Sequence, residues 1–115
     1  MIHIEILPAY GAQNGYYRAT GHAAEGKEQI CTAVTAIEEC LAANLENVWN
    51  LRLERKAEKG RYTLRWWKSD RQGKGIPRAN SAAGFAYTGL RALAKTYPDE
   101  LKVEWKRPEI EKRRE

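Results

Sequence analysis

The stretch 19–45 holds a cysteine and a histidine at a spacing that suits nucleophilic chemistry. Cys31 stands near the start of a helical pattern, and His22 precedes it by nine residues. The thiolate is the nucleophilic form of cysteine, and a helix N-terminus favours it because unpaired backbone N–H groups and the positive end of the helix dipole lie there. Lys27 adds a positive charge beside the helix start. Cys31 is therefore placed where a reactive thiol is expected.

The same two residues also have a purely structural explanation. Cysteine is among the most buried residue types, and a lone cysteine at a helix start usually packs as a small hydrophobic side chain. A loop of this length lets the His22 and Cys31 side chains meet without requiring it. Spacing alone leaves both explanations open.

The surrounding motif adds a second line of evidence. The run GHAAEGKEQICTAVTAI, residues 21–37, resembles the signature of the Prp family of ribosomal-processing cysteine proteases. The matching positions are Gly21, His22 and Ala23 in a triplet, Gly26 in the loop, and Cys31, Ala33, Val34 and Ala36 at the helix start. The departures from the family pattern are a shorter loop, Glu28 for Asp, Gln29 for an aliphatic residue, and Thr35 for Ser.

The resemblance implies a cysteine endopeptidase in which His22 is the general base and Cys31 the nucleophile. Its substrate would be a large-subunit ribosomal protein that loses a short N-terminal extension, or a phage-related capsid-type protein, cut just after an aromatic pair. Backbone N–H groups around Gln29 to Cys31 would form the oxyanion hole. The resemblance also implies a homodimer and no cofactor. The residues then expected to contact the substrate are Gly21, Ala23, Gly26 and Glu28.

Length and composition predict one domain over residues 1–107, followed by a charged tail over 108–115. A chain of 115 residues and 13.2 kDa supports one modest core. Its N-terminus MIHIEILPAY alternates in polarity, unlike the apolar core of a signal peptide, and no long apolar run suggests a membrane span. We therefore expect a cytoplasmic protein with no membrane contact.

The two cysteines are expected to be free thiols. Cys31 and Cys40 fall on one predicted helix, where nine residues at about 1.5 Å rise separate them by roughly 13 Å, too far for a disulfide. We expect Cys40 to lie in the core. We expect no metal site, because the sequence has no CxxC pair and only His3 and His22 as histidines.

Hydrophobic periodicity predicts seven elements. Alternation predicts strands at residues 2–6, 16–20, 49–54, 61–66 and 101–105, with His3 on a solvated face. Helical spacing predicts one helix over residues 30–45 and a second from Asn80 or Ser81 to about Tyr97, stopped by Pro98. This order predicts a two-layer α+β domain with one sheet of about five strands and two helices packed on one face.

Residues 52–78 form a basic segment that suggests an alternative function. They hold ten Lys or Arg against three Asp or Glu, a local net charge of +7 in a chain whose total is +5. Such a segment, with Trp67 able to stack, fits a non-catalytic module that binds RNA or the ribosome. It fits equally well a solvated sheet edge protected by its charges. Nucleic acid is therefore a secondary expected partner.

Overall fold

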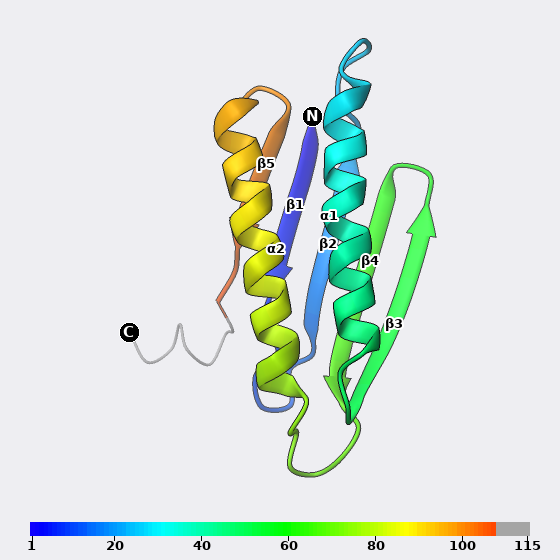
Figure 1. The fold of residues 1–115 in the computed structure, drawn as a ribbon, viewed down its shortest axis with the longest axis vertical. Coiled ribbons are helices and arrows are strands. Elements are labelled where there is room, and N and C mark those ends of the chain that lie inside the picture. The colour runs from blue at the N-terminus through cyan, green and yellow to red at the C-terminus, as the bar shows by residue number, and fades with distance from the viewer. Residues whose placement is uncertain (108–115) are drawn as a thin grey trace.

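The computed structural model describes residues 1–107. Both helices pack on one face of a single five-stranded sheet (Figure 1). The predicted α+β architecture is confirmed. The elements in chain order are β1 (Ile2–Leu7), β2 (Gly15–Gly21), α1 (Glu28–Glu46), β3 (Leu51–Glu58), β4 (Arg61–Lys68), α2 (Ile76–Thr96) and β5 (Leu101–Trp105).

The strand order β3-β4-β2-β1-β5 places β3 and β5 at the two edges of the sheet. Neighbouring strands run antiparallel except β1 and β5, which are parallel because α2 carries the chain across the sheet between β4 and β5. The alternating isoleucines Ile2, Ile4 and Ile6 are buried beneath the helices, as a strand with one covered face requires. The core therefore lies between the sheet and the two helices.

The second helix begins earlier than predicted. It starts at Ile76, before the expected cap at Asn80 or Ser81, and it ends at Thr96 ahead of Pro98 as expected. Pro77 occupies the first turn, where its missing N–H costs no helical hydrogen bond and its fixed φ suits the helix. The prediction was wrong because Asn80 resembles an N-cap residue in type, although its side chain serves another purpose.

Asn80 ties the loop between β1 and β2 to helix α2 by hydrogen bonds. Its Oδ1 accepts hydrogen bonds from the Ala9 backbone N–H at 3.0 Å and from Trp66 Nε1 at 3.2 Å, while its Nδ2 donates to the Ala9 carbonyl at 2.9 Å. Trp66 is fully buried, so its indole N–H has no access to water and needs this acceptor. One amide therefore holds the loop before β2, strand β4 and helix α2 together.

Two further predictions about side-chain positions were wrong. Trp49 lies outside β3 and is 84% exposed, because Asn50 adopts a left-handed backbone with φ of 59° that delays the strand until Leu51. Cys40 is exposed instead of buried. The reason is that α1 turns its neighbour Leu41 into the core and buries Glu38, so that the residue at position 40 faces away from the sheet.

Asn80→Ala should lower the free energy of unfolding by about 2–4 kcal/mol, since three hydrogen bonds are lost and the buried Trp66 N–H is left without an acceptor. Urea denaturation of both proteins measures the change. Ser81→Ala, at an exposed position on the same helix, should change it by less than about 0.5 kcal/mol. Equal stabilities of the Asn80→Ala and Ser81→Ala proteins would contradict the proposed fastening role.

Candidate active site

A cleft of about 220 Å³ contains both His22 and Cys31. It lies where the end of β2, the first half of α1 and the turn between β3 and β4 meet, and its lining includes Gly21, Thr35 and Gly60. The structure therefore brings together the thiol and the imidazole that the sequence separates by a loop. Cys31 is partly buried and His22 is exposed.

Two glycines fix the position of His22. Gly21 has φ of +89°, and a Cβ there would come within 2.2 Å of the Met1 carbonyl oxygen. Its N–H donates to the Gly60 carbonyl at 3.0 Å, which ties the end of β2 to the β3–β4 turn. A Cβ on Gly60 would lie 3.0 Å from His22 Nε2, so the glycine leaves room for the imidazole above the turn.

Cys31 is the fourth residue of α1, in the first turn of the helix. The Glu28 carboxylate accepts a hydrogen bond from the Gly26 N–H at 3.1 Å. Hydrogen bonds from its own backbone N–H and from Gly26 lower the pKa of Glu28, so this exposed carboxylate stays ionised and holds the turn before the helix. The Ile30 N–H donates to the Lys27 carbonyl at 3.0 Å, whereas the Gln29 N–H has no hydrogen-bond partner in residues 1–107.

The other predicted substrate-contacting residues lie at different distances from the cleft. Gly21 lines it directly. Ala23 packs against the core just after β2. Gly26, with φ of +86°, lies in the turn before α1, Glu28 is the first residue of α1, and neither lines the cleft. Their place is in the loop that carries the chain from His22 to Cys31, so contact with a substrate remains a prediction for them.

Sequence reasoning missed the buried acid of this cleft, Glu38. It lies seven residues after Cys31 on α1, the spacing of two helical turns, and it lines the same cleft. Its Oε2 accepts a hydrogen bond of 2.5 Å from the buried Tyr17 hydroxyl on β2. Burial raises the pKa of Glu38, and burial together with the neighbouring Glu38 charge raises the pKa of Tyr17. The helical spacing was the one available signal, but nothing local marked the acid as buried.

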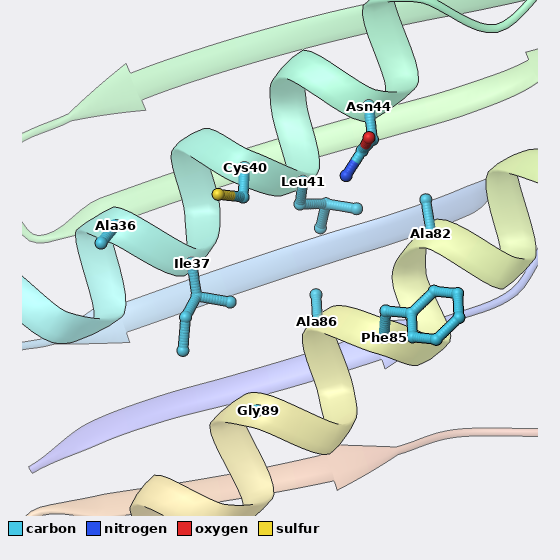
Figure 2. A pocket seen from close by; sticks show the side chains of 9 residues that line it. All are labelled: Ala36, Ile37, Cys40, Leu41, Asn44, Ala82, Phe85, Ala86 and Gly89. Carbon is cyan, nitrogen blue, oxygen red and sulfur yellow. The ribbon is translucent and has the colours of Figure 1, made fainter.

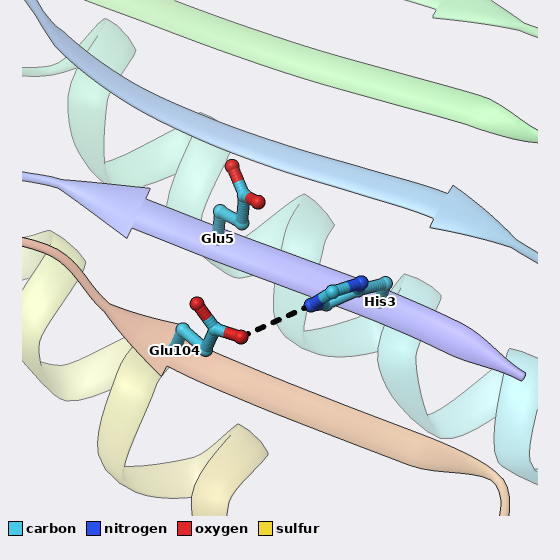
Figure 3. A group of neighbouring side chains, drawn as sticks. All are labelled: His3, Glu5 and Glu104. Carbon is cyan, nitrogen blue, oxygen red and sulfur yellow. Dashed lines mark hydrogen bonds and ion pairs between the residues drawn. The ribbon is translucent and has the colours of Figure 1, made fainter.

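A group of possible metal ligands lies on the opposite side of the sheet. His3, Glu5 and Glu104 project from β1 and β5 on the face that the helices leave open, with one ligand atom of each within 4.8 Å of the others (Figure 3). Hydrogen bonds from His3, at 3.2 Å, and from Lys102 lower the pKa of Glu104, and Lys106 pairs with Glu5 at 3.5 Å. Lysine ammonium groups therefore already neutralise both carboxylates, and the group is separate from the cleft.

A groove of about 280 Å³ lies between the outer faces of α1 and α2 (Figure 2). Ile37 and Leu41 line one side, and Phe85, which is 80% exposed, and Ala86 line the other. Cys40 also lines it, so the second thiol faces a different hollow from Cys31.

Neither helix in residues 1–107 has the long apolar run that a bilayer span requires.

The basic segment 52–78 forms most of the β3–β4 hairpin and the start of α2. Strand β3 is an edge of the sheet, where charged side chains discourage pairing with another chain. Two of its charged side chains are partnered, because Arg55 pairs with Glu39 and Glu54 pairs with Arg65. This placement fits the explanation of the segment as a protected edge.

Solved structures share this arrangement of elements, whereas no protein-family model and no curated protein matches the chain. The crystal structure of the essential ribosomal processing protease Prp from S. aureus, with a covalently linked product peptide, superposes with a TM-score of 0.70. This chain has the fold of Prp. The identity is 14%, over 92% of this chain and 100% of the other.

Two further structures give the same result. The S. aureus Prp complex with a substrate peptide has a TM-score of 0.70 at 13% identity, with 92% of this chain and 100% of the other covered. The crystal structure of SMU.848 from Streptococcus mutans has a TM-score of 0.67 at 20% identity, with 94% and 96% covered. The resemblance inferred from residues 21–37 is therefore confirmed at the level of the fold.

His22→Ala should slow alkylation of Cys31 by iodoacetamide about tenfold at neutral pH, because an imidazole in the same cleft can take the thiol proton. Cys40 is the internal control, since it is exposed and lies in another groove, and its rate should not change. Peptide mapping by mass spectrometry reads both rates from one sample. An unchanged rate at Cys31 would reject the pairing of the two side chains.

Proposed function

We propose that this protein is a cysteine endopeptidase whose nucleophile is Cys31 and whose general base is His22. The observation that carries the proposal is that His22 and Cys31 line one cleft in a chain with the fold of Prp. A helix start, a thiol in its first turn and an imidazole from a neighbouring strand supply the parts that thiol proteolysis needs.

The reaction would proceed through an acyl-enzyme. His22 takes the proton from the Cys31 thiol, and Sγ attacks the scissile carbonyl carbon to give a tetrahedral intermediate. The imidazolium then donates its proton to the leaving amine as the C–N bond breaks, which leaves a thioester on Cys31. Water, deprotonated by His22, attacks the thioester and releases the acid product and the free thiol.

The Gln29 backbone N–H would stabilise the oxyanion. It lies in the first turn of α1 and has no hydrogen-bond partner in the described part of the chain, whereas the adjoining Ile30 N–H is engaged by Lys27. A backbone donor without a partner at a helix start is available to the negative charge that develops in the transition state. The positive end of the α1 dipole acts in the same direction.

The substrate class proposed for this site is a protein with a short N-terminal extension. The S. aureus neighbour is named as a ribosomal processing protease and was solved with substrate and product peptides. For this chain we propose a large-subunit ribosomal protein or a phage-related capsid-type protein, cut after an aromatic pair in the cytoplasm. The proposed reaction uses groups of the polypeptide and one water molecule.

Incubation with a candidate precursor should release its N-terminal extension as one fragment, with the cut directly after the aromatic pair. Intact-mass analysis of the mixture measures this, and the Cys31→Ala protein should leave the precursor whole because it has no nucleophile. Cys40→Ser is the matched control and should cut normally. Cleavage that persists in the Cys31→Ala protein would show that another residue, or a contaminant, is responsible.

We also propose a homodimer. Phe85 and Trp49 are 80% and 84% exposed, and a second copy would remove such large apolar side chains from water. Light scattering at tens of micromolar should give twice the chain mass of 13.2 kDa. A monomer mass throughout that range would refute the dimer without affecting the assignment of Cys31.

A further inference from the structure

Among residues 1–107, Glu38 is the one charged residue that is buried, with 7% of its surface exposed. It lies in the wall of the cleft that contains Cys31. An ionised carboxylate out of water is costly unless hydrogen bonds or an opposite charge compensate it. Tyr17 compensates one oxygen, Oε2. The other oxygen, Oε1, has no hydrogen-bond partner among the described residues, and it is not sealed off from solvent.

A second polar group without a hydrogen-bond partner lies in the wall of the same cleft. Tyr62 lines the same cleft, and its ring meets that of Tyr17 edge to face with centroids 6.1 Å apart. The Tyr62 hydroxyl is shielded from solvent and has no hydrogen-bond partner. Burial raises the pKa of Tyr62, and the Glu38 charge contributes to the rise, so the hydroxyl is neutral at pH 7 and adds no negative charge to the cleft.

Because Tyr17 satisfies only one oxygen of Glu38, a ligand in the cleft can still donate hydrogen bonds to the other. The donor that suits a carboxylate oxygen is a cation with several N–H groups, namely an ammonium or a guanidinium group. The cleft also offers an apolar wall of Ile2, Ala19 and Val34, against which a methylene stem can lie. A lysine or arginine side chain combines both features.

The charges around Glu38 leave this place open to a cation. Arg55, whose charge acts on Glu38, is held by an ion pair with Glu39 and lies over the Tyr62 ring at 5.4 Å from its centroid. Arg61 lines the cleft together with the acid Glu58. The formal charges of the lining therefore include two carboxylates against one guanidinium, apart from His22.

We propose that Glu38, with the apolar wall beside it, forms a subsite that binds a lysine or arginine side chain of the peptide substrate, an inference that rests on the proposed protease function. Glu38 lies seven residues along α1 from Cys31, which at 1.5 Å per residue is about 10 Å. An extended peptide covers about 3.3 Å per residue, so the basic residue lies within about three positions of the cleaved bond.

The test measures peptide binding to the Cys31→Ala protein, which requires no turnover. Decapeptides with a central Phe-Phe-Ala carry lysine or norleucine at each of three positions on either side, since norleucine keeps the stem and lacks the charge. At one position the lysine peptide should bind about tenfold more tightly by fluorescence anisotropy, as expected for a charge-assisted hydrogen bond. The absence of a lysine preference at every position would overturn the proposal.

Glu38→Gln in the same background should bring the ratio of lysine to norleucine affinities close to one, because glutamine still accepts the Tyr17 hydrogen bond but carries no charge. Glu46→Gln is the control, since Glu46 is exposed at the end of α1 and lies outside the cleft lining. A preference that survives Glu38→Gln would overturn the proposal. Thermal unfolding of each variant checks that it is folded.

Glu38→Asp provides a second variant if Glu38→Gln fails to fold, because it keeps the charge but draws the carboxylate back by one methylene group. It should lower the ratio several-fold, and an unchanged ratio would overturn the subsite. Cleavage of the same peptides by the wild-type protein separates the two proposals. Cleavage without a lysine preference would refute the subsite alone, and a Glu38-dependent preference without cleavage would refute the protease function alone.

Discussion

The hydrogen bond between the Gly21 N–H and the Gly60 carbonyl is the constraint on which the candidate site depends. It joins the end of β2, which His22 follows directly, to the turn of the β3–β4 hairpin, and the imidazole lies beside Gly60. Gly21 must then turn with φ of +89° beside the Met1 carbonyl, a conformation that only glycine adopts without strain. The loop that follows returns the chain to α1 and places Cys31 in the same cleft.

Helix α1 then serves both the core and the cleft. Its apolar residues Ile30, Val34 and Leu41 bury the stripe that holds it on the sheet, while Cys31 and Thr35 lie at the flank of that stripe and line the cleft. Glu38 takes part in both, since Tyr17 anchors it from β2 and its second oxygen is unused. A buried acid at this point is costly for stability, and a role in binding substrate would explain why the helix carries it.

The elements of the fold were predictable because each buries one face and so leaves a period in the sequence, as in Ile2, Ile4 and Ile6 or along α1. The joint position of His22 and Cys31 was predictable from the motif. Glu38 was not, because its partner Tyr17 lies on another element and pairing across the core leaves no local signal. The start of α2 was missed for the same reason, since Asn80 bonds to Ala9 and Trp66 and caps no helix.

The most direct test of the central claim, that Cys31 is a nucleophile activated by His22, is covalent capture with a peptide chloromethyl ketone ending in Phe-Phe. Mass spectrometry of the intact protein, followed by peptide mapping, gives both the stoichiometry and the site. The structure predicts one peptide per chain, bound to Cys31 through a thioether, with loss of labelling in His22→Ala. Labelling of Cys40 at the same rate, or labelling of Cys31 that does not depend on His22, would contradict the claim.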